Sequence, residues 1–158
     1  MNDNETGASR TRAALYGRVS TLDQNPESQL HDLRRYAEHR GWSIVEEFID
    51  HGISGTKDSR PSLNRMMAAA RQRRFDVVLV WRFDRFARST SHLIRALDDF
   101  RSLGIAFCSF SEALDTSTPT GKVMFTVIAA MAEFERALIQ ERVRAGLRRA
   151  RAAGAQLG

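Results

Sequence analysis

The stretch Ala13-Ala-Leu-Tyr-Gly-Arg18-Val-Ser20-Thr21-Leu-Asp23-Gln24 joins a short apolar run to a polar segment. The run predicts a strand over residues 13–20. Residues two apart on a strand point to the same side, so Arg18 and Ser20 should share one face at the strand's end. A hydroxyl beside a guanidinium, with no histidine nearby in the sequence, favours chemistry on a phosphate. This segment alone leaves open a serine that caps the next helix beside a surface arginine.

Strands and helices alternate along the rest of the chain. Apolar runs predict further strands over residues 43–49, 77–81 and 105–110, and helical periodicity or capping signals predict helices over residues 26–40, 62–73, 90–103 and 121–151. Asn25 is the expected N-cap of the first helix, with Leu30, Leu33 and Ala37 on its buried stripe. The pattern predicts an α/β fold, with a central, mostly parallel sheet of four to five strands flanked by helices and followed by a long C-terminal helix.

Composition narrows the possible partners and compartment. The 158 residues suffice for one domain with a core, and the net charge of +5 favours a polyanionic partner. Nearly all the basic side chains are arginines, which grip two phosphate oxygens at once, although an arginine-rich genome would also raise their number. The single cysteine, Cys108, excludes an intrachain disulfide and a cysteine-based zinc site, and indicates a reducing cytoplasm. No run approaches the roughly 20 apolar residues of a membrane span.

Polar side chains follow each predicted strand of the sheet. Because ligands bind beyond the carboxyl ends of parallel strands, we expect these side chains to converge there. The groups are Ser20 and Gln24, Asp50 and Arg60, Asp84 with Arg85 and Arg88, and the loop over residues 111–119. In a helical conformation Arg82, Arg85 and Arg88 would stack on one face, with Phe83 and Phe86 turned inward. A bound phosphate would relieve the repulsion among these arginines, whereas a solvated basic face is the alternative.

The last predicted helix is unusually long and changes character along its length. Its first half is apolar and its second half is basic, which predicts a dimerisation element whose end lies along DNA. The alternative is a core helix with a solvated tail. The expected interface residues are Met124, Ile128, Met131, Phe134 and Leu138, and the expected DNA contacts are Arg142, Arg144, Arg148, Arg149 and Arg151.

Four ordered motifs together resemble the catalytic domain of the serine recombinases, the resolvase and invertase family of site-specific DNA recombinases. They are Tyr16-Gly-Arg-Val-Ser-Thr-Leu-Asp-Gln24; Asp50-His-Gly-Ile-Ser-Gly55 with Arg60-Pro-Ser-Leu63; Trp81-Arg-Phe-Asp-Arg-Phe-Ala-Arg-Ser89; and Ala132-Glu-Phe-Glu-Arg136 with Glu141-Arg142. The resemblance spans nearly everything after residue 12.

The resemblance implies a role for each matching residue. Ser20 would attack a DNA phosphodiester and become joined to the 5′ phosphate, without a metal, ATP or any other cofactor. Asp84 would orient Arg85 or Arg88. The arginines expected around the scissile phosphate are Arg18, Arg60, Arg85 and Arg88, and the expected supporting residues are Gln24, Gln29 and Asp50.

The resemblance also implies partners and a domain organisation. The partners would be double-stranded DNA and a second copy, with two dimers pairing into a tetramer, in a bacterial or mobile-element cytoplasm and away from membranes. The expected division is a disordered leader over 1–12, a catalytic domain over 13–119 and a long helix with the start of a linker over 120–158. The helix-turn-helix domain typical of such proteins is expected to be absent from these 158 residues.

Two other function classes remain open at this point. One is a catalytically silent module for dimerisation and DNA binding, which the intact Ser20 and its arginines argue against. The other is a metal-dependent nuclease with Asp50, Asp84 and Glu112 as ligands, although these carboxylates lack recognisable ligand spacing. The sequence leaves open whether the outcome is resolution, inversion or integration.

Overall fold

The computed structural model describes residues 9–23, 25–52 and 59–156. The predicted strands and helices all form, with ends shifted by up to three residues. The elements are β1 (Arg12–Ser20), α1 (Pro26–His39), β2 (Ser43–Gly52), α2 (Pro61–Arg71), β3 (Val77–Val80), α3 (Phe83–Phe86), α4 (Thr90–Ser102), β4 (Ala106–Ser109), β5 (Leu114–Asp115) and α5 (Pro119–Ala152).

The five strands form one sheet in the order β2-β1-β3-β4-β5. The first four strands of that order are parallel, and only the two-residue strand β5 runs antiparallel, at the edge beside β4. The α/β fold class with a mostly parallel sheet is therefore confirmed. The polar segments after β1, β2 and β3 follow the carboxyl ends of neighbouring strands, as the predicted site requires.

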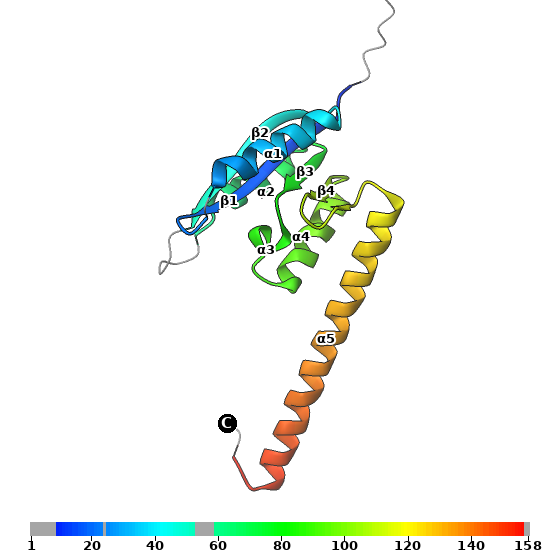
Figure 1. Ribbon diagram of the computed structural model, residues 1–158. Helices are drawn as coiled ribbons and strands as arrows, with labels where there is room; N and C mark the ends of the chain where they lie inside the picture. Colours follow the sequence, from blue (N-terminus) through cyan, green and yellow to red (C-terminus); the bar gives the residue numbers. More distant parts are fainter. Residues whose placement is uncertain (1–8, 24, 53–58, 157–158) are drawn as a thin grey trace, which may run out of the picture.

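Both faces of the sheet are covered. Alternate residues of β1 point to opposite sides, so that Ala13 and Leu15 pack toward α1 while Ala14 and Tyr16 join the larger core beneath α2 and α4. In Figure 1 α1 crosses the strands on one side of the sheet. All four residues of β3 are buried, which explains its unbroken apolar sequence. Full burial of one large apolar side chain contributes about 1.5–3 kcal/mol, so this two-sided core gives the strand ends a rigid support.

The helix caps follow the sequence signals. The Asn25 side chain accepts a hydrogen bond from Ser28 N at 3.2 Å, as predicted, and Pro26 takes the first helical position of α1. Gly41 follows the helix with a φ of +70°, a left-handed conformation that favours glycine. Leu30, Leu33 and Ala37 form the buried stripe of α1, as expected from their spacing.

The buried residues of helix α5, Gly121, Phe125 and Ala132, lie in its first half. Its first turns adjoin β5 and α4, and the remainder projects away from the sheet in Figure 1. Thr118 caps the helix by accepting a hydrogen bond from Gly121 N at 3.0 Å, and its own hydroxyl donates to the Asp115 carbonyl at 2.8 Å. A Cβ at Gly121 would overlap that carbonyl oxygen. Only glycine therefore allows this close approach between helix and strand.

Candidate active site

A tight turn at the carboxyl end of β1 presents Ser20. Its backbone N–H donates to Asp23 Oδ2 at 2.8 Å, and Asp23 N donates back to the Ser20 carbonyl at 3.0 Å. The Ser20 hydroxyl oxygen accepts a hydrogen bond from Leu22 N at 3.0 Å. A donor aimed at this oxygen favours its ionised form. The turn thus holds a half-buried hydroxyl beyond the sheet, with one N–H already directed at it.

Asp23 connects this turn to α3. Its second carboxylate oxygen, Oδ1, accepts a hydrogen bond from Arg85 Nη2 at 2.6 Å. The Asp23 side chain is only 7% exposed and that of Arg85 is 34% exposed, so the charge-assisted bond is shielded from solvent. Asp23 was not among the predicted site residues. The signal that could have identified it is its position three residues after Ser20, where its carboxylate reaches the Ser20 N–H.

Asp84 occupies a different place from the one predicted for it. Its carboxylate forms an ion pair with Arg82 at 3.0 Å, and both side chains are at least half exposed. Arg85 instead pairs with Asp23, so the prediction that Asp84 orients Arg85 is wrong. The alternative, that Asp84 orients Arg88, is not tested by these contacts and stays a prediction.

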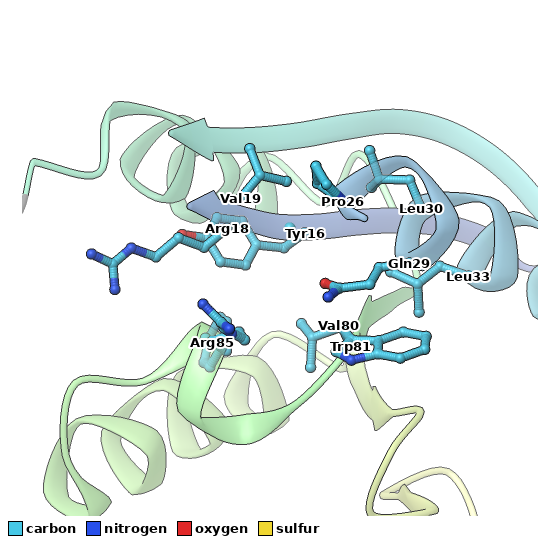
Figure 2. A pocket seen from close by; sticks show the side chains of 12 residues that line it. Tyr16, Arg18, Val19, Pro26, Gln29, Leu30, Leu33, Val80, Trp81 and Arg85 are labelled. Carbon is cyan, nitrogen blue, oxygen red and sulfur yellow. The ribbon is translucent and has the colours of Figure 1, made fainter. Parts of the chain in front are cut away.

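A small cavity brings together three of the predicted residues. Arg18 of β1, Gln29 of α1 and Arg85 of α3 all line it. Figure 2 shows Arg18 at the end of β1 above Arg85, with the Gln29 amide on the side of α1. A Cβ at Gly52 would lie 3.2 Å from Arg18 Nε, so the absence of a side chain at the end of β2 leaves room for this guanidinium. Gly52 is a second residue that the sequence analysis missed.

Asp50 is buried and contacts Tyr16, a residue that lines this cavity. It is 2% exposed, and its carboxylate accepts hydrogen bonds from Ser62 N at 2.8 Å, Leu63 N at 2.9 Å and the Tyr16 hydroxyl at 2.9 Å. The two backbone donors are the orphan N–H groups of the first turn of α2, where a negative charge is favourable. Burial, together with the Asp50 charge, raises the pKa of Tyr16 well above its usual value. Asp50 therefore fixes α2 against β1, and its supporting role in catalysis stays a prediction.

Arg60 contacts the end of α3, and Arg88 lies in the segment that follows α3. Arg60, the N-cap residue of α2, is 4% exposed and donates from Nη1 to the Phe86 carbonyl at 2.6 Å. Arg88 is exposed, and its backbone N–H donates to His92 Nδ1 at 3.2 Å. Helix α3 ends at the extended residue Ala87, so Arg88 lies outside it. The predicted helical stack of Arg82, Arg85 and Arg88 is therefore wrong, although Phe86 is buried and Phe83 packs against the core as expected.

The remaining predicted residues do not form a metal centre. The Glu112 carboxylate accepts hydrogen bonds from the Ser109 hydroxyl and from Phe83 N, while Asp50 is held by its three donors and Asp84 by Arg82. Within residues 9–23, 25–52 and 59–156, no three histidine, cysteine, aspartate or glutamate side chains are grouped as a metal would require. The nuclease ligand set is thus not assembled there. Gln24 lies outside the described residues.

Arg18 and Arg85 line the cavity, and Asp23 links Arg85 to the turn that carries the Ser20 hydroxyl. Comparison with known proteins assigns the chain to a family. A family model described as the resolvase N-terminal domain matches residues 13–156. The chain belongs to the resolvase family. It shares that family with enzymes named as serine recombinases, DNA-invertases and transposon resolvases, so the chain is a serine recombinase enzyme of a family that acts on DNA.

Curated resolvase-family relatives match most of the chain. The serine recombinase gin of Escherichia phage Mu is 41% identical over 139 residues, which cover 88% of this chain and 67% of gin. The Tn917 resolvase of Enterococcus faecalis is 37% identical over 143 residues, covering 90% of this chain and 73% of the resolvase. This resolvase-family chain therefore spans about two thirds of the phage relative. In the part of the chain that the structure describes, no helix has the length and apolar character needed to cross a membrane.

Solved structures of the resolvase family share the fold described above. The N-terminal catalytic domain of TP901-1 integrase superposes with a TM-score of 0.73 at 37% identity, covering 80% of this chain and 98% of that domain. A resolvase family site-specific recombinase from Streptococcus pneumoniae superposes with a TM-score of 0.76 at 30% identity. The match covers 90% of this chain and 99% of the recombinase chain.

Proposed function

We propose that this chain is the catalytic part of a site-specific DNA recombinase that cuts and rejoins DNA through a covalent bond between Ser20 and a 5′ phosphate, without a metal ion or ATP. The observation that carries the proposal is the Asp23 carboxylate, which ties the Ser20 turn to Arg85 of the arginine-lined cavity. A hydroxyl and a guanidinium are thereby held on one rigid unit. The resolvase and invertase names of the relatives support DNA as the substrate.

The proposed step conserves both bonds and protons. Ser20 Oγ forms a bond to phosphorus, the bond from phosphorus to the 3′ oxygen breaks, and the proton lost from the serine is matched by one gained at the 3′ oxygen. One phosphodiester replaces another, so the phosphoserine retains the bond energy needed for religation and no nucleotide is consumed. Religation is the same step in reverse, with the 3′ hydroxyl of another strand as the nucleophile.

Arginines supply the electrostatic part of the proposed mechanism. Phosphoryl transfer spreads negative charge over the equatorial oxygens, and catalysis consists mainly of positioning and charge stabilisation. One unit-charge pair at 4 Å contributes about 4 kcal/mol at an effective dielectric near 20, before desolvation. We assign Arg18 and Arg85 to the phosphate from the cavity side. We assign Arg60, at the N-cap of α2, and Arg88, after α3, to the same phosphate. Asp84 orients Arg88, and the supporting residues are Gln24, Gln29 and Asp50.

Helix α5 supplies the proposed contacts with a second copy and with DNA. Phe134 is 64% exposed, and the first half of the helix carries further solvent-exposed apolar side chains on the same side. A stripe of this kind fits a homodimer, and two dimers would form the synaptic tetramer. We propose residues 13–119 as the catalytic domain and 120–158 as the dimerisation and DNA-contacting segment. Its proposed interface residues are Met124, Ile128, Met131, Phe134 and Leu138, and its proposed DNA contacts are Arg142, Arg144, Arg148, Arg149 and Arg151.

The experiment is a covalent-adduct assay with radiolabelled duplex DNA on a denaturing gel, in EDTA and without nucleotide. The wild-type chain should form an adduct. Ser20→Ala should form none while it retains DNA binding in a native gel shift, and Ser102→Ala, at an exposed serine of α4, should match the wild type. If the Ser20→Ala variant still forms the adduct, Ser20 is not the nucleophile. Loss of the wild-type adduct in EDTA would contradict metal independence. A wild-type chain that binds DNA and never forms the adduct would favour the silent binding module.

A further inference from the structure

His92 closes the turn between α3 and α4 with two hydrogen bonds, one to Ser89 and one from Arg88. It lies in the first turn of α4, where its backbone N–H donates to the Ser89 hydroxyl at 3.1 Å. Its ring nitrogen Nδ1 accepts a hydrogen bond from Arg88 N at 3.2 Å. The arrangement resembles a capping box, in which the third helical residue returns a hydrogen bond to the backbone before the helix. A histidine in this role is an acceptor only while it is uncharged.

The ring of His92 also packs on Phe86, the residue whose carbonyl accepts the hydrogen bond from Arg60. It stacks on Phe86 with ring centroids 6.2 Å apart and an interplanar angle of 11°. The carbonyl of the same Phe86 accepts the hydrogen bond from Arg60. His92 therefore contacts both ends of residues 86–88: the ring of the residue that receives Arg60, and the backbone of Arg88.

We propose that His92 is a positioning residue for Arg60 and Arg88. It acts as an uncharged hydrogen-bond acceptor and holds residues 86–88 in the geometry that fixes the Arg60 guanidinium through the Phe86 carbonyl and directs Arg88 to a DNA phosphate. The role of these arginines at the phosphate rests on the proposed function above. The contacts of His92 with Phe86 and Arg88 do not depend on it.

The surroundings of His92 favour the uncharged ring. Burial, and then the positive charges of Arg60, Arg88 and Arg95, lower the pKa of His92 below its usual 6.5. Asp99 lines the same cavity between α2 and α4 as His92 and Arg95, and it is the acidic residue among the side chains that line this cavity. A proton on Nδ1 would remove the acceptor for Arg88 N and add a positive charge among three arginines. Acid should therefore release the Arg88 backbone.

Two substitutions separate the acceptor from the ring. His92→Asn places an amide oxygen near the position of Nδ1 and does not titrate, whereas His92→Phe keeps the stacking on Phe86 and removes the acceptor. Two-dimensional NMR of the free chain follows the Arg88 amide between pH 5 and pH 8. In the wild type this amide should shift on the acidic side of pH 6.5 together with the His92 imidazole signals. In both variants the acid-dependent shift should be absent.

The adduct assay supplies the functional measurement. At pH 7.5, His92→Asn should form the adduct within about 3-fold of the wild-type rate, and His92→Phe should be slower by about 10-fold, the effect of losing one net hydrogen bond. The wild-type rate should fall in acid faster than the His92→Asn rate does. Thermal unfolding monitors the folding of each variant.

Each result decides one part of the proposal. The positioning role would be overturned if the NMR signal of the Arg88 amide does not change as His92 titrates. It would also be overturned if His92→Phe forms the adduct at the wild-type rate. If the wild type forms no adduct under any condition, the proposed function fails, and the Arg88 amide titration still decides whether His92 holds that backbone. If His92→Phe fails to fold, the comparison of the wild type with His92→Asn across pH carries the test.

Discussion

The carboxylate of Asp23 holds the backbone of Ser20 with one oxygen, at 2.8 Å, and the guanidinium of Arg85 with the other, at 2.6 Å. These contacts join the first strand of the sheet to the short helix after its third strand. Without this carboxylate, the turn that carries the proposed nucleophile Ser20 would be free to move relative to the Arg85 guanidinium on α3. The shared carboxylate fixes the separation of the two groups before DNA binds.

Replacement of Asp23 by asparagine should weaken both contacts. The amide keeps one acceptor, loses the negative charge, and leaves either Ser20 N or Arg85 without its partner. We expect a loss of about 1–3 kcal/mol in the free energy of unfolding and a drop of at least 10-fold in adduct formation. Urea unfolding and the adduct gel measure the two effects.

The matched control is Glu46→Gln, which removes the carboxylate of a partly exposed pair with Arg74. It should change the free energy of unfolding by less than about 1 kcal/mol, as exposed ion pairs do. Equal effects of Asp23→Asn and Glu46→Gln on stability would show that the Asp23 bridge is no stronger than a surface pair.

Two glycines of α5 should respond in opposite directions to alanine. At Gly121 the new Cβ would overlap the Asp115 carbonyl, so the backbone must move, and we expect destabilisation by about 2 kcal/mol or more. At Gly146 no atom lies within 4 Å of the added Cβ, and alanine should stabilise the helix by about 0.5–1 kcal/mol. Chemical denaturation of both variants tests the pair. If Gly121→Ala is as stable as the wild type, helix and strand do not approach as closely as described.

Phe134→Asp should shift the chain toward monomer in sedimentation velocity. The substitution places a charge in the middle of the exposed apolar stripe of α5, where burial against a second copy would carry a large desolvation cost. Gln140→Asp adds the same charge to the same helix at an exposed polar position, and its profile should stay like the wild type. An identical profile for the wild type and Phe134→Asp at the same concentration would argue against α5 as the interface.

Acid should weaken the junction between β5 and α5 through Asp115. Burial raises the pKa of Asp115, but hydrogen bonds from Ser117 and the ion pair with Arg40 outweigh it and bring the pKa below the usual 3.8. A lowered pKa in the folded state means that this stabilisation is complete above pH 3.8 and is lost as the pH falls through the folded value. Urea midpoints should therefore drop more steeply below pH 4 in the wild type than in Asp115→Asn. Parallel curves for the two proteins would contradict the assignment.

The fold was largely accessible from the sequence because its local signals agree with one another. Apolar runs of the right length identified four strands, and Asn25 with Pro26 marked the start of α1. Strand β5 has only two residues, and its pairing with β4 depends on the reversal of the chain after Phe110 rather than on a periodic pattern. Such a short edge strand has no signature of its own.

The sequence predicted which residues come together at the candidate site, but it did not predict which acidic residue pairs with which arginine. Arg18, Gln29 and Arg85 meet at one cavity because the carboxyl ends of parallel strands lie together, which is a rule of topology. The partner of Arg85 could not be inferred in this way, since Asp84 is adjacent in sequence whereas Asp23 is 62 residues away. The helical stack of arginines failed because α3 is a single turn that ends at Phe86 and the next residue, Ala87, is extended.

Because the buried residues of α5 lie in its first half, a small tilt at the start of the helix produces a large displacement at its far end. Its 34 residues, at about 1.5 Å of rise each, extend about 50 Å from the Thr118–Gly121 junction. A tilt of about 5° at that junction would carry the arginine-rich end through about 4 Å, roughly the width of one side-chain contact. The hydrogen bonds of Asp115 and Thr118 therefore act as a fulcrum, and small changes in their geometry are magnified at the far end of the helix.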